Sequence, residues 1–501
     1  MTNKSSRLII NSIYLFSRLI ITLFISLYTS RLILNELGVE DFGIYNVVGG
    51  IVSILTFLTG AMSSSTQRFL SFELGKDNND IKRIFSASIN VYSVIIVIVI
   101  ILSQTIGLWF VNNKLNIPVD KRMDTYWVYQ VSVLSFLVAI FSAPYNAALI
   151  AYERMKVYAY IGIFSVLTKL ILVLMLSFIP ENKLVWFSIL MLAQTSVTLL
   201  LPMLYCKVKI PGVKYKFSLD KELSIRLMSY TGWNLFGNLS AVGFNQGINV
   251  LINIFFGPSV NASRAISTQV NSAVLNFSSS LNTAINPQII KRYSNKDLCS
   301  MRDLVTKTSK YCFLLLCLLG IPILFNTKEL IYFWLGSIPE NSVIFTQLII
   351  IDSIIGGFSG PLMTSIQATG KIKYYQIVVG GLLLLNVPIS YVALLYSKSP
   401  SVPYYVVIIL SVIAFNARIM FTRYLVGIGF KQLYTKVVLR CAIVIIFSLV
   451  LIEVMIYKIH TNAIINIFMC ASIVLSQILL FGLDSKEKRY ILSAIKNKLK
   501  K

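Results

Sequence analysis

The sequence predicts an all-α integral membrane protein of about 14 transmembrane helices, in which two parallel six-helix repeats precede two additional helices. Three observations support this fold class. Hydrophobic residues make up 56% of the 501 positions and charged residues 13%, whereas about 25% of a soluble chain is charged. Apolar stretches of about 20 residues, the length that crosses a bilayer, recur along the whole chain. Motifs also recur at a nearly constant separation. The composition excludes a large soluble catalytic domain and an extended disordered region.

The predicted spans are each about 20 to 27 residues long. The first apolar stretch follows Lys4 and Arg7 but continues to about Leu34, so we interpret it as a span rather than a cleavable signal peptide. The expected limits of the spans are 9–33, 42–65, 85–110, 126–149, 157–179, 184–205, 229–256, 260–286, 308–325, 343–367, 374–396, 403–424, 437–457 and 463–483.

Lys and Arg residues are concentrated in alternate loops. The set of connections that includes both chain ends holds about 32 of them and the other set about 7. Because positively charged loops stay in the cytoplasm, we expect both termini there. The net charge of +25 therefore reflects topology, and we expect no nucleic-acid partner. The basic segment from Lys486 onward is either a surface helix attracted to anionic lipids or a simple topology anchor.

Internal repeats set the domain organisation. The segment SAPYNAALIAYERMKVYAY from Ser142 matches SGPLMTSIQATGKIKYYQI from Ser359 without gaps, at an offset of 217. LILNELGVEDFG from Leu32 matches LINIFFGPSVNA from Leu251 at an offset of 219. Parallel repeats are typical of transporters whose substrate site lies between the halves. The expected domains are two six-helix bundles over 1–215 and 216–432, helices 13 and 14 over 433–483, and a basic cytoplasmic tail over 484–501.

Several ionisable residues fall inside the predicted spans, where a charge at mid-bilayer costs at least about 2.5 kcal/mol. Arg18, Lys169 and Asp352 lie near the middle of their spans, and Arg264 lies about one turn from the outer edge of its span. Others are close to span ends, where a long side chain reaches the interface: Arg31, Lys310 and Arg418. Arg18, Lys169, Asp352 and Arg264 are therefore candidates for a functional site.

Polar residues form stripes along one face of several spans, judged at about 100° per residue. Arg18 belongs to a stripe on the first span and Arg264 to one on the eighth. Lipid offers such faces no partner, so they contact water or another helix. Hydrogen bonding inside a packed bundle is the alternative, and we expect a polar cavity between the halves. The candidate binding asparagines of the seventh and eighth spans are Asn238, Asn245, Asn249, Asn271 and Asn282.

Such a cavity would be cationic, because the three bases Arg18, Lys169 and Arg264 face one acid, Asp352. Arginine donates two parallel hydrogen bonds to phosphate, and Asn, Ser and Thr side chains suit hydroxyl groups. A lipid-linked sugar phosphate meets both demands. Asp352 either pairs with one of the bases or binds a coupling proton or Na⁺. The sequence contains neither a CxxC pair nor a GxxxxGK[ST] loop, so we expect no metal, no cofactor and no ATP-driven cycle.

The block YTSRLILNELGVEDFGIYNVVGGIVSILTFLTGAMSSSTQRFLSFELGK, from Tyr28 to Lys76, resembles the opening of Wzx-type O-antigen and polysaccharide flippases. The arrangement of six, six and two helices is similar to that family over the full length. The family belongs to the multidrug/oligosaccharidyl-lipid/polysaccharide (MOP) exporter superfamily. The resemblance implies a V-shaped pair of bundles in the bacterial inner (cytoplasmic) membrane. It also implies alternating access that moves an undecaprenyl-pyrophosphate-linked oligosaccharide, an O-antigen or capsule repeat unit, to the outer leaflet.

Lipid II flippases of the same superfamily have functional arginines in their first, second and eighth helices. Arg18 and Arg264 occupy comparable helices, whereas the second span has Tyr45 and no mid-span arginine. We infer that Lys169 supplies the missing charge from the fifth span. By the same resemblance, spans 13 and 14 are expected to form a groove for the lipid tail.

We therefore expect a flippase and not an enzyme, with a lipid-linked oligosaccharide and membrane lipids as partners. Polysaccharide polymerases and glycosyltransferases are further candidate partners. A multidrug/cation antiporter of the same superfamily is the alternative, although it would favour buried carboxylates and only Asp352 is well placed. An integral-membrane polymerase or glycosyltransferase is the other alternative. Such enzymes need clustered acids and histidines, and the longest predicted external loops, of about 15 to 17 residues, are short.

Overall fold

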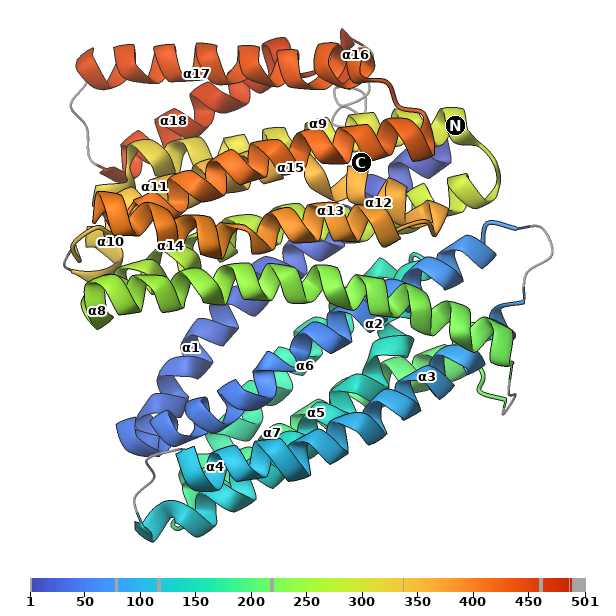
Figure 1. The fold of residues 1–501 in the computed structure, drawn as a ribbon, viewed down its shortest axis with the longest axis vertical. Coiled ribbons are helices and arrows are strands. Elements are labelled where there is room, and N and C mark those ends of the chain that lie inside the picture. Colours follow the sequence, from blue (N-terminus) through green and yellow to red (C-terminus); the bar gives the residue numbers. More distant parts are fainter. Residues whose placement is uncertain are drawn as a thin grey trace, which may run out of the picture. The chain divides into compact units, whose positions relative to one another are not determined.

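The computed structural model describes residues 2–76, 80–114, 119–216, 220–336, 338–458, 463–485 and 487–488. Within these ranges the chain is helical and contains no strand. The helices are α1 (Thr2–Ile54), α2 (Thr56–Glu73), α3 (Ile81–Leu102), α4 (Leu108–Lys114), α5 (Arg122–Ala151), α6 (Met155–Met175), α7 (Lys183–Lys209), α8 (Lys221–Ser294), α9 (Leu298–Phe325), α10 (Thr327–Leu335), α11 (Ser342–Gly356), α12 (Ser359–Thr369), α13 (Lys373–Leu384), α14 (Asn386–Ser397), α15 (Val402–Val426), α16 (Phe430–Leu433), α17 (Leu439–Lys458) and α18 (Ala463–Gln477) (Figure 1). Short π-helical turns cover Ser103–Gly107, Tyr434–Val438 and Ile478–Gly482, and 3-10 turns cover Val119–Lys121 and Leu176–Phe178.

The all-α membrane fold that the sequence predicts is confirmed. Ten helices in the described ranges are long and apolar enough to cross a membrane, or up to eleven if the bent pair α11 and α12 forms one span. The predicted spans 42–65, 260–286 and 437–457 are helical but do not belong to this set. The second of them carries the polar stripe with Arg264, which lowers its hydropathy. From residue 489 onward the predicted basic tail lies outside the described residues.

The chain divides into two compact units. Unit 1 contains residues 1–239 and 283–296, and unit 2 contains residues 240–282 and 297–501. Helix α8 therefore contributes to both units. The predicted limits at 215 and 432 describe repeats along the sequence, and they stay predictions.

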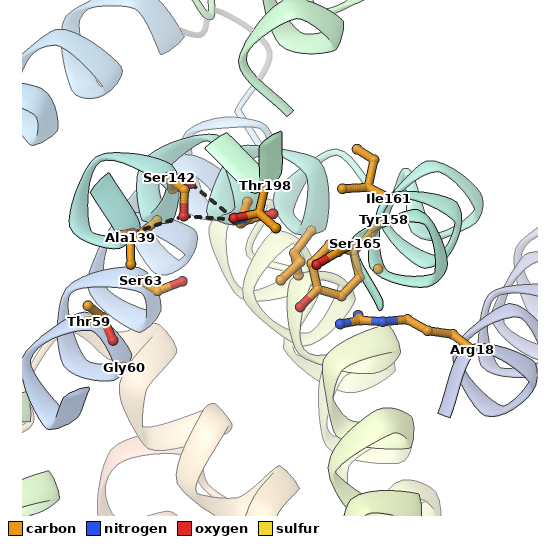
Figure 2. A pocket seen from close by; sticks show the side chains of 14 residues that line it. Arg18, Thr59, Gly60, Ser63, Ala139, Ser142, Tyr158, Ile161, Ser165 and Thr198 are labelled. Carbon is orange, nitrogen blue, oxygen red and sulfur yellow. Dashed lines mark hydrogen bonds between the residues drawn. The ribbon is translucent and has the colours of Figure 1, made fainter. Parts of the chain in front are cut away.

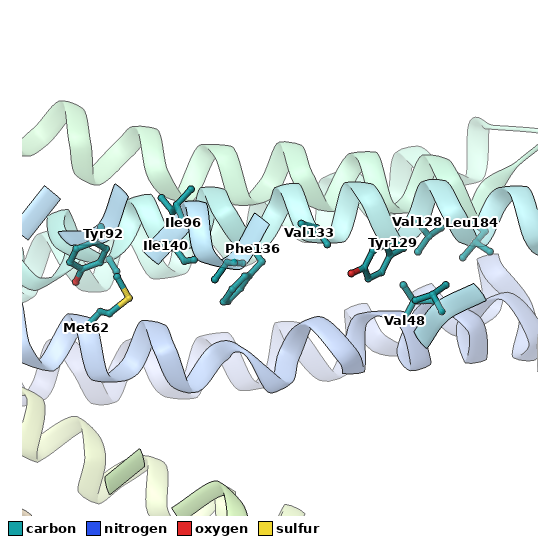
Figure 3. Packing of buried hydrophobic residues seen from close by; sticks show 13 residues of the cluster. Val48, Met62, Tyr92, Ile96, Val128, Tyr129, Val133, Phe136, Ile140 and Leu184 are labelled. Atoms are coloured by element: carbon teal, nitrogen blue, oxygen red, sulfur yellow. The ribbon is translucent and has the colours of Figure 1, made fainter. Parts of the chain in front are cut away.

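Unit 1 is organised around α5, which packs against α2, α3 and α7, while α6 packs against α1 and α7. The buried face of α5 meets side chains from α1, α2, α3, α4 and α7 in a continuous apolar cluster, drawn in Figure 3. Its labelled members are Val48, Met62, Tyr92, Ile96, Val128, Tyr129, Val133, Phe136, Ile140 and Leu184. This cluster fixes the positions of α2 and α5, which form two walls of the cavity described below.

Unit 2 is organised around α15, which packs against α11, α12, α13 and α14, and around α9, which packs against α11, α12 and α18. Helices α17 and α18 pack against each other. The segment after α18 is tied to α9 by charge. Lys310 of α9, 3% exposed, forms an ion pair with Glu487 at 2.7 Å, and the Tyr311 hydroxyl donates to the same carboxylate at 2.7 Å.

The backbone conformation supports the internal repeat. Gly38 (φ 74°, ψ 172°) interrupts α1 and Gly257 (φ 79°, ψ −176°) interrupts α8, 219 positions later. A φ in this region strains residues with a Cβ, so glycine is favoured. The left-handed residues Glu153 and Gly370 are likewise 217 positions apart. Equivalent turns therefore recur at the separations at which the sequence motifs recur.

Helix caps follow the same period. Asp80 precedes α3 and accepts the backbone N–H of Arg83 at 3.2 Å, and Asp297 precedes α9 and accepts that of Ser300 at 3.2 Å. Both are N-caps, which satisfy a free N–H at the start of a helix. Their separation of 217 positions lets residues of the two units be compared one by one.

Candidate functional site

Unit 1 contains an open cavity of about 410 Å³. Helices α1, α2, α5, α6 and α7 form its walls, and Figure 2 shows the side chains that line it. None of its 14 lining residues is Asp or Glu. Its lining residues are Arg18, Thr59, Gly60, Ser63, Ala139, Ser142, Ala143, Asn146, Ile150, Tyr158, Ile161, Gly162, Ser165 and Thr198. The cavity thus combines one cation with hydroxyl and amide groups.

Arg18 extends from α1 toward α6 at the edge of this cavity (Figure 2). Its guanidinium carbon lies 4.4 Å from the centroid of the Tyr158 ring, a cation–π contact. In the described part of the chain, no hydrogen bond or ion pair engages this guanidinium. A guanidinium carries five N–H donors. Those of Arg18 are therefore available to an anionic ligand.

Helices α5 and α6 contribute neutral polar side chains to the cavity lining. Asn146 donates to the backbone oxygen of Ser142 at 3.2 Å, which leaves the amide oxygen of Asn146 without a partner among the described residues. Gln194 donates to the Ser165 hydroxyl oxygen at 2.7 Å and so orients it. Hydroxyl and amide groups of this kind exchange hydrogen bonds with sugar hydroxyls.

Lys169 does not line the cavity, but it lies on the same face of α6 as the residues that do. Tyr158, Gly162, Ser165 and Lys169 are spaced four, three and four residues apart on α6. At 100° per residue they share one face of the helix. Lys169 is half-buried, and no described residue forms an ion pair or hydrogen bond with its ammonium group. A second cation therefore follows the cavity along α6.

Arg264 has a different environment, inside unit 2. Its side chain is 3% exposed and donates to the Asn249 amide oxygen and, at 3.1 Å, to the backbone oxygen of Asn245. The Tyr404 ring lies 5.7 Å from its guanidinium carbon. The predicted residues Arg264, Asn245 and Asn249 thus come together. They bind one another across the turn of α8 at Gly257.

The remaining predicted residues are spread over both units. Asn238 lies in the part of α8 that belongs to unit 1 and is half-buried. In unit 2, Asn271 accepts a hydrogen bond from Ser353 at 2.6 Å, and the Asn282 oxygen accepts one from the Cys312 thiol at 3.4 Å.

Asp352 is the predicted ion-coupling or salt-bridge residue. Its Oδ1 is buried and has no hydrogen-bond partner among the described residues. No described base forms an ion pair with it within 4 Å. The roles predicted for these residues stay predictions.

Sequence reasoning missed most of the cavity lining. Ser142 and Tyr158 lie in the repeated segment that begins at Ser142, but no binding role is predicted for them, and none is predicted for Gly162 or Ser165. One signal was available. The i, i+4, i+7, i+11 spacing of Tyr158, Gly162, Ser165 and Lys169 places a lysine and polar residues on one face of an apolar span.

Comparison with known proteins supports a membrane transporter fold. No family model matches the chain. A curated relative, the uncharacterized membrane protein EpsK of Bacillus subtilis (strain 168), is 21% identical over 335 residues. The match covers 66% of this chain and 65% of the relative, so the chain spans about two thirds of that protein's length.

Solved structures match over more of the chain. One shows the outward-facing conformation of a multidrug resistance MATE family transporter of the MOP superfamily, with a TM-score of 0.73 and 13% identity, covering 83% of this chain and 95% of that one. A MATE protein in the straight conformation gives a TM-score of 0.72 and 14% identity, covering 84% and 96%. A MOP superfamily transporter from Pyrococcus furiosus, described as having a binding pocket of reverse polarity that suggests a different function, gives 0.67 and 13%, covering 83% and 95%. The chain has the fold of these transporters and is a multi-pass membrane protein.

Proposed function

We propose that this protein is a transporter that moves an anionic, lipid-linked oligosaccharide from the inner to the outer leaflet of a bacterial cytoplasmic membrane by alternating access. The observation that carries the proposal is Arg18, a guanidinium at the edge of an acid-free polar cavity with no hydrogen-bond or ion-pair partner among the described residues. A guanidinium binds phosphate through two parallel hydrogen bonds. Such a cavity suits an anion better than an organic cation.

The physics of the cargo fits this cavity. The lipid tail stays in the bilayer while the phosphate and sugar groups leave water, so the protein must replace their lost hydrogen bonds. Arg18 serves the phosphate, and the Ser142, Asn146 and Ser165 side chains serve the sugar. A membrane potential that is negative inside favours outward movement of an anion by about 2.3 kcal/mol per charge per 100 mV.

A multidrug/cation antiporter is the second candidate function, and the named function of a solved neighbour supports it more directly than it supports oligosaccharide flipping. Within the chain, the observation that favours it is the buried, unpaired Oδ1 of Asp352, because carboxylates bind protons, Na⁺ and organic cations. The chemistry of the unit 1 cavity favours the first candidate. The Pyrococcus furiosus neighbour, with its pocket of reverse polarity, supports the view that pocket charge differs within this fold.

A transport assay separates the two candidates. Purified protein is reconstituted into liposomes with a pyrophosphate-linked oligosaccharide lipid, and exposure of the sugar to a membrane-impermeant lectin is followed. We expect flipping by the natural protein and at least a tenfold lower rate for Arg18→Gln. Arg31→Gln, which removes the same charge from an exposed position on the same helix, is the matched control and should keep the natural rate. Ethidium uptake without any flipping would establish the antiporter instead.

A further inference from the structure

The position of Arg18 depends on a gap in the surface of α6. A Cβ added at Gly162 would collide with the Arg18 Nε and would lie 2.7 Å from the guanidinium carbon, closer than such atoms approach in real structures. Tyr158, one turn earlier on α6, places its ring face 4.4 Å from the same carbon. Glycine therefore admits the guanidinium to the helix surface, and the tyrosine ring holds it there.

The second repeat keeps the tyrosine of this arrangement but has neither the glycine nor the arginine. Within continuous helices, the repeat offsets pair Tyr158 with Tyr375, Gly162 with Val379 and Arg18 with Gly237. The tyrosine is kept, but the glycine is replaced by a valine that is 3% exposed and packs in an apolar cluster with Tyr375. A side chain at this position is thus compatible with the packing of the repeat. At this position, glycine occurs only in the first repeat, which is also the repeat that has the arginine.

The cation–π contact draws the Arg18 guanidinium to the Tyr158 ring. The five N–H donors of a guanidinium lie along its planar edge. Because no described residue accepts these N–H groups, the edge is free to bind a ligand in the cavity. Ring and backbone together hold the fork in place before a ligand arrives, which lowers the entropy lost on binding.

We propose that Tyr158 and Gly162 are specificity-determining residues: they seat Arg18 so that its guanidinium edge binds the pyrophosphate of a lipid headgroup. The inference rests on the proposed function and deepens it, because it assigns the anion selectivity of unit 1 to two uncharged residues of α6. We call the Gly162 gap and the Tyr158 ring the seat of Arg18. Without this seat, the Arg18 side chain would have no fixed position in the cavity.

Calorimetric titration of the purified full-length protein tests the seat. The probe is geranyl pyrophosphate, a soluble prenyl pyrophosphate, compared with geraniol and with inorganic pyrophosphate. We expect geranyl pyrophosphate to bind, geraniol not to bind, and inorganic pyrophosphate to bind at least tenfold more weakly. Equal binding of the inorganic ion would overturn the assignment to a lipid headgroup.

Variants separate the seat from a purely structural role. Gly162→Ala should weaken geranyl pyrophosphate binding at least tenfold. Gly381→Ala, on the corresponding helix of unit 2 where a Cβ meets open space, should change it less than twofold. Tyr158→Leu removes the ring and should bind about threefold to thirtyfold more weakly, whereas Tyr158→Phe keeps the ring face and should bind more tightly than Tyr158→Leu. The double variant Arg18→Gly/Gly162→Val copies the second repeat. It should melt close to the natural protein but lose the ligand.

The outcomes distinguish this inference from the proposed function. If the natural protein binds geranyl pyrophosphate and Gly162→Ala binds it equally well, the seat is wrong while the anion cavity stands. If the natural protein does not bind the probe but transports ethidium, the proposed function is wrong and the seat with it.

Discussion

Units 1 and 2 place equivalent residues in opposite environments. In unit 1, Asn146 and Ser165 line a polar cavity. In unit 2, the residues 217 positions later are Met363 and Leu382, which pack against an apolar cluster that includes Val379. Equivalent positions of the two repeats thus line a polar cavity in one unit and pack in an apolar core in the other. The scaffold is shared, and the chemistry comes from a few side chains.

The arginines of the two units show the same contrast. Ser142 and Tyr158 line the cavity, and Arg18 contacts the Tyr158 ring without a hydrogen-bond or ion-pair partner among the described residues. Their equivalents in unit 2 bind a different arginine, because Arg418 of α15 donates to the Ser359 hydroxyl at 3.2 Å and to the Tyr375 hydroxyl at 3.4 Å. The Ser359 and Tyr375 hydroxyls thus accept hydrogen bonds from a structural arginine in unit 2. In unit 1, no described arginine hydrogen-bonds to the Ser142 or Tyr158 hydroxyl, and the Ser142 hydroxyl donates to the Ala139 backbone oxygen instead.

The largest expected effect concerns a charge that unit 2 has and unit 1 lacks. Lys310 takes the place of Ser93, 217 positions earlier, and binds Glu487 while 3% exposed. Lys310→Ser leaves that buried carboxylate with its hydrogen bond from Tyr311 but without its cation, so we expect a loss of about 3–5 kcal/mol. The measurement is thermal or denaturant unfolding in detergent. Lys310→Ser/Glu487→Gln should recover much of the loss, and an equally unstable double variant would contradict the assigned cause.

The second-largest effect is expected when cavity-lining residues of unit 1 are exchanged with their equivalents in unit 2. Asn146→Met/Ser165→Leu gives the unit 1 cavity the side chains of unit 2. It should lower oligosaccharide flipping at least tenfold without lowering the unfolding temperature, because apolar groups replace the polar lining. The reverse change, Met363→Asn/Leu382→Ser, should cost about 2 kcal/mol of stability, since it puts polar groups into apolar packing. Loss of flipping in the reverse variant alone would reverse the roles of the units.

A smaller effect is expected at the left-handed turn that follows the α5 and α12 helices. Glu153 has φ 58° and binds Lys291 at 2.8 Å, whereas its equivalent is Gly370. Both Glu153→Gly and Glu153→Ala remove the ion pair, but only alanine keeps the strain of a Cβ at this φ. The glycine variant should therefore be more stable by about 1 kcal/mol. Equal melting temperatures in detergent would contradict a strained turn.

The smallest effect is expected where the second repeat begins. Arg83 and the backbone N–H of Leu223 hydrogen-bond to Asp220 and lower the pKa of this carboxyl from its usual 3.8. A lowered native pKa contributes stability above about pH 3.8, and this is lost as the pH falls through the native value. The melting temperature of the natural protein should exceed that of Asp220→Asn slightly at pH 6, and the difference should shrink toward pH 3. A difference that grows on acidification would contradict this sign.

The helical fold could be predicted because its causes are local. Apolar length, the Lys and Arg asymmetry and the matches near Leu32 and Ser142 depend on the sequence alone, and the paired turns at Gly38 and Gly257 agree with the predicted repeat. The candidate site could be predicted less well. The sequence predicts that the face of α8 with Asn245 and Asn249 lines a cavity. In the structure, the Asn249 amide oxygen accepts from Arg264, and the Asn245 side chain donates to the backbone oxygen of Ala241 in its own helix.

The sequence does not show which neighbouring helix each polar helix face contacts. Helical periodicity shows that a face is polar, but not whether its partner is water, a ligand or another side chain. Arg18 and Arg264 both lie on polar faces of predicted spans, and their different states depend on residues of the neighbouring spans. Asn249 binds Arg264, whereas Gly162 makes room for Arg18. Such contacts follow from the packing of two helices, which no single-helix pattern contains.

The measurement that tests the central claim most directly is the position of the cargo. A cryo-electron microscopy structure of the full-length protein in nanodiscs, with bound pyrophosphate-linked oligosaccharide lipid, would show it. We predict density for the pyrophosphate within hydrogen-bonding distance of Arg18, between Tyr158 and Ser142. Density beside Arg418 in unit 2, or an organic cation in the unit 1 cavity, would contradict the account.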